Sequence, residues 1–351
     1  MVDAHWWLGI VKPGVAKTCL TLGATLTLLA GAAPVIAAGT ARADSIRAPV
    51  LESKITLDHV HGRIDHLAVD IARQRLYVAE LGNDTVGVVD LKNHAVTSTL
   101  RGFHEPQGVG YEPTTDTLYV ANGGDGTVDL FQGADLTPIG KITLGDDADN
   151  VRVDPITHRV IVGYGSGALA VIDPVSRKRI ALIRLRGHPE SFQMDRTGEH
   201  IFVNVPNSGE IAVVDVNQNQ QAASWTPAGL HANFPLAIDE SHHRVLTVFR
   251  HPSKLGVFNA EDGTLVSSVD TCGDADDVFV DPKRSLVYVI CGEGVIDVLV
   301  AQGNSYVKST QTATIGGART ALFVPDMDRL FLAVRATLSE PAAIWVYRPG
   351  P

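Results

Sequence analysis

The stretch RLYVAELGNDTVGVVD, from Arg75 to Asp90, decides the fold of this chain, because near-copies of it recur along the sequence. Each copy places a turn residue before an apolar strand, and a polar turn then separates that strand from a second one. The seven turn residues are Asp70, Glu112, Asp154, Asp195, Asp239, Asp281 and Pro325. Their spacings are 42, 42, 41, 44, 42 and 44 residues. A period of about 40–45 residues built from four short strands is typical of a propeller blade, so the sequence predicts an all-β, seven-bladed β-propeller with four antiparallel strands per blade.

Each blade is expected to run from an innermost strand at the central channel to an outer strand at the rim. The innermost strands are predicted at residues 66–70, 108–112, 151–154, 191–195, 235–239, 277–281 and 321–324. Only three strands are predicted in the seventh repeat, the last of them at 342–347. The sequence KITL at 54–57 repeats at 141–144, the outer-strand position of the second repeat. We therefore expect residues 51–57 to supply the missing strand and to close the ring, which removes open sheet edges.

The first 43 residues have the features of a secretory leader. Lys12 and Lys17 precede an uncharged apolar run at 19–38, and Ala41-Arg42-Ala43 matches a cleavage site. Retention as an uncleaved membrane anchor is the alternative, because the run is about long enough to cross a bilayer. The sequence thus predicts a signal peptide at 1–43 and a single propeller domain at 44–351. We expect a periplasmic or secreted monomer with no stable membrane span after cleavage.

The charge and the cysteines limit the partners and the compartment. The formal net charge is −10, and loss of residues 1–43, which hold three basic residues and one acidic residue, leaves −12. A protein this acidic has no general attraction to nucleic acid. Two cysteines remain after the leader, Cys272 and Cys291, and they predict a disulfide in an oxidising compartment, with two free thiols as the alternative. The sequence has no Cys-x-x-Cys-His motif, so we expect no covalent haem.

Two of the repeats carry a family resemblance. Residues 76–80 read LYVAE and residues 118–122 read LYVAN, and both resemble the YVTN family of bacterial β-propeller repeats. The resemblance extends over residues 55–348 and is strongest in the first two repeats. It implies a seven-bladed, exported protein. It implies no particular reaction, because the residues that carry it are core and turn residues.

The loops that enter the innermost strands are expected to converge on one mouth of the channel. These loops are rich in His, carboxylate and amide side chains. The candidate ligand-binding residues are Asp65, His66, His104, Glu105, Asn150, His188, Glu190, His231, Asp276, Asp277 and Arg319. Carboxylate, amide and imidazole groups suit hard or borderline cations, so a divalent cation is a candidate cofactor at this mouth.

Three functions are compatible with such a mouth. The first is an exported binding protein that engages a small molecule or a partner protein there, and it is the function we expect. The second is a metal-dependent hydrolase of lactones or related esters, similar to the propeller lactonases, for which the sequence identifies no catalytic residue. The third is a structural envelope protein whose acidic rim is only solvated surface. An α/β-hydrolase triad is excluded, because no G-x-S-x-G motif occurs.

Overall fold

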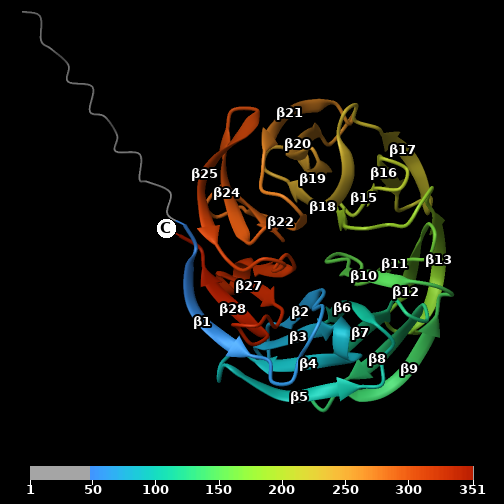
Figure 1. Ribbon diagram of the computed structural model, residues 1–351. Helices are drawn as coiled ribbons and strands as arrows, with labels where there is room; N and C mark the ends of the chain where they lie inside the picture. The colour runs from blue at the N-terminus through green and yellow to red at the C-terminus, as the bar shows by residue number, and fades with distance from the viewer. Residues whose placement is uncertain (1–47, 351) are drawn as a thin grey trace, which may run out of the picture. The chain divides into compact units, whose positions relative to one another are not determined.

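Residues 48–350 are described by a computed structural model, in which they form a ring of seven sheets (Figure 1). Each sheet has four strands, and every neighbouring pair of strands is antiparallel, as the two pairs in the first blade illustrate. The predicted seven-bladed β-propeller is therefore confirmed. The predicted leader, residues 1–43, lies outside the described residues, and its cleavage stays a prediction. No helix within residues 48–350 is both long enough and apolar enough to span a membrane.

The two strands nearest the channel in each blade match the apolar segments of the repeat. The innermost strands are β2 (Leu67–Asp70), β6 (Pro106–Glu112), β10 (Ala148–Val153), β14 (Phe192–Met194), β18 (His231–Asp239), β22 (Ala275–Asp281) and β26 (Ala321–Val324). The second strands are β3 (Arg75–Glu80), β7 (Thr117–Asn122), β11 (Val160–Tyr164), β15 (His200–Val205), β19 (Arg244–His251), β23 (Leu286–Cys291) and β27 (Arg329–Val334).

The remaining strands lead outwards to the rim. The third strands are β4 (Thr85–Asp90), β8 (Thr127–Gln132), β12 (Ala168–Asp173), β16 (Glu210–Asp215), β20 (Ser253–Asn259), β24 (Val295–Gln302) and β28 (Ala343–Arg348). The outer strands are β5 (Ala95–Arg101), β9 (Thr137–Thr143), β13 (Lys178–Arg184), β17 (Gln220–Trp225), β21 (Leu265–Asp270), β25 (Ser305–Ala313) and β1 (Val50–Thr56). Two short 3₁₀ turns, η1 (Leu81–Asn83) and η2 (Pro325–Met327), lie between strands.

An acidic side chain holds the turn between the first and second strands in six blades. Asp70 Oδ1, for example, accepts a hydrogen bond from the Arg73 amide at 3.0 Å, and Glu112 Oε1 accepts one from the Thr114 amide at 2.8 Å. In the seventh blade Pro325 begins η2 instead. These are the roles expected of carboxylate and proline side chains in tight turns.

The core consists of apolar side chains that lie between neighbouring blades. Between the first two blades, Tyr77 and Val88 pack with Leu118 and Val120, and all four side chains are at most 1% exposed. Equivalent clusters occupy the other blade interfaces. Neighbouring sheets thus pack face to face, with apolar side chains of both sheets forming the core between them.

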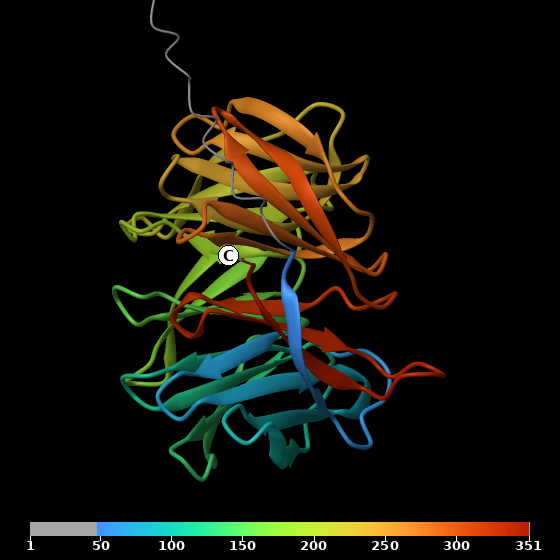
Figure 2. The same cartoon turned by 90° about the vertical axis from the view of Figure 1, so that its left-hand side faces the viewer.

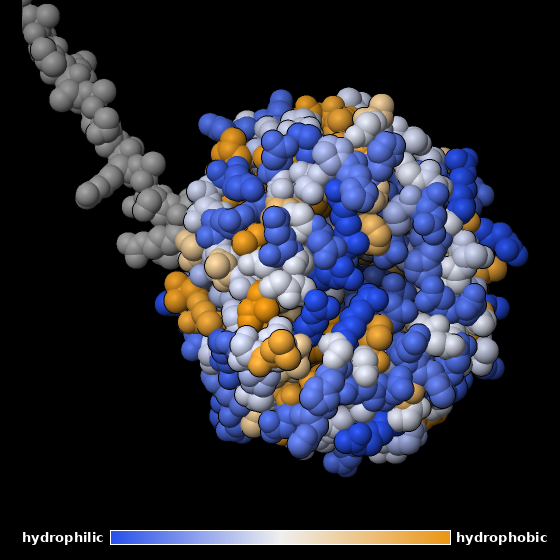
Figure 3. Space-filling model, in the orientation of Figure 1, coloured by the Kyte–Doolittle hydropathy of each residue, from blue (hydrophilic) through white to orange (hydrophobic). Residues whose placement is uncertain are grey.

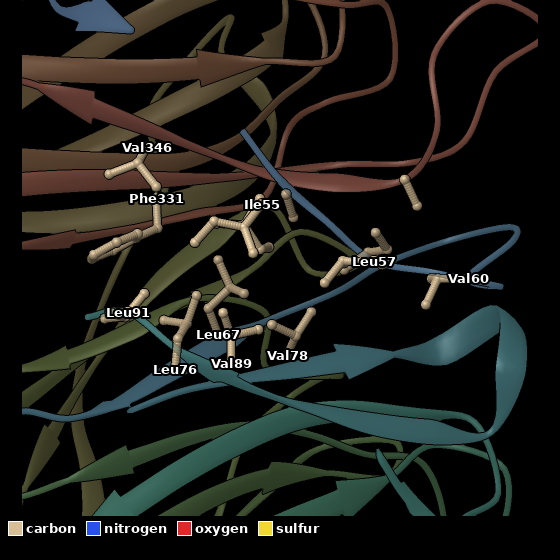
Figure 4. Packing of buried hydrophobic residues seen from close by; sticks show 14 of the residues in the cluster. Ile55, Leu57, Val60, Leu67, Leu76, Val78, Val89, Leu91, Phe331 and Val346 are labelled. Atoms are coloured by element: carbon tan, nitrogen blue, oxygen red, sulfur yellow. The ribbon is translucent and has the colours of Figure 1, made fainter. Parts of the chain in front are cut away.

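Strand β1 closes the ring, as predicted from the repeated KITL sequence. It pairs antiparallel with β28, from Val50 opposite Arg348 to Thr56 opposite Ala343, and becomes the outer strand of the seventh blade (Figure 2). Its Ile55 side chain and the following Leu57 are 1% and 2% exposed. Figure 4 shows both side chains among residues of the first and seventh blades. The first strand in the sequence therefore holds the two ends of the ring together.

Candidate ligand-binding site

A cavity of about 350 Å³ lies at the mouth where the entering loops meet, and all seven blades contribute to it. It is lined by Arg63, Gln107, Asp147, Asp149, His188, Glu190, Asn207, Phe234, Arg250, Asp276 and Arg319. Figure 3 views one face of the ring and shows hydrophilic residues gathered around the central hollow. A second cavity of about 330 Å³ is lined by the innermost strands, with His66, Arg152 and Asp277 among mostly apolar side chains.

One side of the mouth cavity is formed by the loops that enter the third and fourth blades. His188 lies between two carboxylates there: its Nε2 is 3.6 Å from Asp149 Oδ2, and its Nδ1 is 3.5 Å from Asp147 Oδ2. Nδ1 also donates a hydrogen bond to the Gly165 carbonyl at 2.7 Å. Burial lowers the pKa of His188, but these acceptors outweigh it and raise the pKa to about 9. His188 is therefore an imidazolium at neutral pH.

Two buried acceptor atoms in consecutive residues at the start of the third blade have no hydrogen-bond partner within residues 48–350. They are Asp149 Oδ1 and Asn150 Oδ1, in residues that are 7% and 2% exposed. The nearest nitrogen of His66 is 3.8 Å from Asp149 Oδ1, which is beyond hydrogen-bond distance. Burial lowers the pKa of His66 to about 4, so its ring is neutral and contributes no positive charge. The site thus has oxygen atoms that are free to accept hydrogen bonds from N–H or O–H groups of a ligand.

The remainder of the cavity lining is rich in arginine. Arg250 Nη2 is 2.6 Å from Asp276 Oδ1, and its guanidinium lies 3.7 Å from the centre of the Phe234 ring. Arg319 contacts Asp274 at 2.9 Å and Asp276 at 3.0 Å. Ion pairs between residues of different blades therefore hold this side of the mouth in place.

A third arginine, Arg63, lies in the loop that enters the first blade. Its Nη2 is 2.7 Å from Asp65 Oδ2, and about half of the Arg63 side chain is exposed. Burial and nearby carboxylates raise the pKa of Asp65 well above its usual value, although Arg63 opposes this. Arg63 therefore lines the cavity beside a carboxyl group whose pKa is raised.

Glu190 lines the cavity and has a pKa close to neutral pH. Burial, reinforced by the charge of Asp149, raises its pKa to about 7. The folded protein therefore binds more protons at Glu190 than the unfolded chain does between pH 4.5 and 7. Stability contributed by this group is present at low pH and is lost as the pH rises through about 7.

We expect that a Glu190→Gln variant does not lose this stability as the pH rises through about 7. The free energy of unfolding of the variant should increase relative to that of the parent by about 1–3 kcal/mol as the pH rises from 4.5 to 7.5. The reason is that glutamine resembles the protonated acid and does not titrate. Urea denaturation at several pH values measures the difference. An exposed counterpart, Glu105→Gln, serves as control and should follow the parent profile. Parallel profiles for the Glu190→Gln variant and the parent would contradict the raised pKa.

The predicted site residues divide into three groups. His188, Glu190, Asp276 and Arg319 line the mouth cavity. His66 and Asp277 line the second cavity, and Asp65 and Asn150 are buried and line neither cavity. The structure does not bring His104, Glu105 and His231 to the cavity, and all three are exposed. A left-handed residue follows each of the two exposed histidines, Glu105 at φ 52° and Ala232 at φ 58°, and the chain changes direction there.

A repeat-based rule would have found three of the seven cavity residues that the prediction missed, namely Gln107, Asp149 and Phe234. Five positions before the turn residue, six of the blades carry Asp65, Gln107, Asp149, Glu190, Phe234 and Asp276. All of these except Asp65 line the cavity, and Asp65 lies under Arg63. Equivalent positions in an internal repeat occupy equivalent places around the ring, so this one offset identifies a lining residue in five of the seven blades. Arg250 is different, because it comes from the end of a second strand, β19.

Metal binding was tested on the donor geometry. Among the described residues, no group of three or more His, Cys, Asp or Glu side chains is arranged to hold a metal ion.

The predicted disulfide is present: Cys272 and Cys291 are bonded, with their Cα atoms 5.9 Å apart, and the bond links the loop before β22 to the end of β23.

Comparison with known proteins supports the fold alone. No protein-family model and no curated protein matches the sequence. Among solved structures, a chain of the "Crystal Structure of Mitotic Checkpoint Complex" is similar, with a TM-score of 0.74 and 15% identity over 95% of this chain and 99% of that one. In all, 1796 solved chains match, so the architecture is too common to indicate one activity.

Proposed function

We propose that this protein is an exported, YVTN-type propeller that binds a small polar ligand in the mouth cavity. The observation that carries the proposal is the buried, unpartnered acceptor Asp149 Oδ1, in a residue that lines a cavity formed by all seven blades, together with Asn150 Oδ1 in the next residue. A buried acceptor without a hydrogen bond costs about 1–3 kcal/mol. A ligand that donates N–H or O–H groups to these atoms offsets this cost.

Two further features support the proposal. The cavity has the concave form and the several convergent polar groups of a small-molecule site, at the small end of the usual volume range. Export is supported by the leader-like sequence at 1–43 and by the Cys272–Cys291 disulfide, since disulfides persist in oxidising compartments.

A thermal-shift screen of polar metabolites tests this function. We expect at least one class among amino acids, sugars, polyols and organic acids to raise the melting temperature, since a ligand that binds only the folded protein stabilises it. The effect should persist with a chelator present and should disappear in an Asp149→Asn variant. A His104→Ala variant, changed outside the cavity, should respond like the parent. A flat response to every class would favour a structural envelope protein instead.

Hydrolysis of lactones or related esters is a second candidate function, favoured by Glu190. A carboxylate with a pKa of about 7 beside a cavity can take a proton from water near neutral pH. Under this function, purified protein should open lactones at a rate that rises through pH 7, and Glu190→Gln should abolish turnover. Unchanged turnover in that variant would assign the activity to another site or to a contaminant.

A further inference from the structure

Carboxylates are in excess on one side of the mouth cavity and arginines line another, although each side also holds a group of the opposite charge, His188 among the carboxylates and Asp276 among the arginines, and this distribution indicates the ligand class. Carboxylates without a close arginine partner, Asp147, Asp149 and Glu190, come from the loops that enter the third and fourth blades. The cationic side is formed by Arg63 and Arg319, from the loops that enter the first and seventh blades, while Arg250 lies in the fifth blade, next to the fourth. The third and fourth blades lie across the ring from the seventh and first, and Figure 1 shows β10 and β27 on opposite sides of the channel.

Each side of the cavity retains a group that is available to bind a ligand. On the acidic side, Asp149 Oδ1 is buried and has no hydrogen-bond partner within residues 48–350. On the basic side, Arg63 makes its ion pair through Nη2, and a guanidinium offers five N–H donors in all. Its side chain is about half exposed, so the remaining donors face the solvent-filled mouth.

We propose that the ligand is a small zwitterion of the amino-acid or short-peptide class, with its ammonium group at Asp149 and Glu190 and its carboxylate at Arg63 and Arg319. This inference rests on the proposed binding function and names the ligand class. An ammonium group supplies the N–H donors that the buried acceptor lacks. A carboxylate matches the planar fork of a guanidinium.

Ligands with one charge fit this cavity less well. A simple amine gains at the acidic side but adds to the positive charge of His188 there and leaves Arg63 and Arg319 without a ligand carboxylate. A simple carboxylate gains at the arginines but lies near Asp147, Asp149 and Glu190. A zwitterion places each charge against its opposite and adds no net charge to the cavity, so both contacts are favourable at once.

Calorimetric titration of the purified protein with the common amino acids and glycylglycine tests the ligand class. The best binder is then compared with its N-acetyl derivative, which lacks the cation, and with its amide, which lacks the carboxylate. We expect each derivative to bind roughly tenfold to hundredfold more weakly, because each loses one charged hydrogen-bonded contact.

Variants assign the two ends of the ligand. Arg63→Gln should weaken binding of the amino acid at least tenfold and should leave binding of its amide unchanged. Glu190→Gln should weaken binding of the amino acid but not of its N-acetyl derivative. Arg196→Gln and Glu105→Gln change exposed residues outside the cavity and should bind like the parent. Melting of each variant without ligand shows whether it is folded.

The outcomes separate this inference from the proposed function. If sugars, polyols or organic acids stabilise the protein and no amino acid or peptide binds, the zwitterion class is wrong while the binding function stands. If nothing in either panel binds, both are wrong. If an amino acid binds and both derivatives bind equally well, the two-ended recognition is overturned.

Discussion

Removal of residues 44–58 should lower the free energy of unfolding by at least about 4 kcal/mol. The deletion removes strand β1, which forms six paired positions with β28, and it also removes the buried side chains of Ile55 and Leu57. Loss of one buried Ile or Leu side chain typically costs 2–5 kcal/mol. The deletion further exposes the edge of β28, which invites aggregation. Urea denaturation of proteins beginning at residue 44 and at residue 59 measures the effect.

Point variants in the same strand provide a matched control. Ile55→Ala should cost about 2–4 kcal/mol, because the side chain is 1% exposed and packs between the first and seventh blades. Val50→Ala, in the same strand, should change stability by less than about 0.5 kcal/mol, because Val50 is 47% exposed. Equal denaturation midpoints for the truncated and longer proteins would show that β1 is not needed to close the ring.

The second large effect is expected from the disulfide. A double Cys272→Ala, Cys291→Ala variant should lose about 3 kcal/mol of stability, because the bond closes a loop with a sequence separation of 19 residues and restricts the unfolded chain. Both cysteines are also buried, at 5% and 0% exposure, so the smaller alanine side chains leave space in the core.

Oxidation state supplies the control for this prediction. Denaturation of the parent under reducing conditions should shift its midpoint towards that of the double variant, while the variant should not respond to the reductant. Alkylation of the unreduced, unfolded parent should modify neither Cys272 nor Cys291. If the parent's denaturation midpoint does not change with reductant and both thiols react with the alkylating agent, the disulfide does not contribute to the stability of the protein.

Most of the fold could be read from local patterns because those patterns repeat. The turn residues at Asp70 and Glu112 recur at one period, and apolar strands follow each of them at matching positions. Even the contact between the first and last strands was predictable, because residues 54–57 copy an outer strand of another repeat. An internal repeat converts a long-range pairing into a comparison between equivalent positions.

The candidate site was predictable in its location and only partly in its membership. The entering loops converge as expected, yet His104 and His231 are exposed while His188 lines the cavity. Arg250 reaches the same cavity from a second strand and pairs with Asp276 of the next blade. Such contacts depend on the curvature of the ring and on loop conformation, which no local pattern records.

The sequence by itself determined the number of blades, their strand order, the closing strand and the cysteine pair, because each follows from spacing along the chain. Only the tertiary structure decided which polar groups act together. Glu105 and Glu190 both lie in entering loops, but Glu105 is exposed, whereas burial raises the pKa of Glu190 to about 7. The difference arises because desolvation depends on what surrounds a carboxylate in space, and residues from all seven blades make up that surrounding.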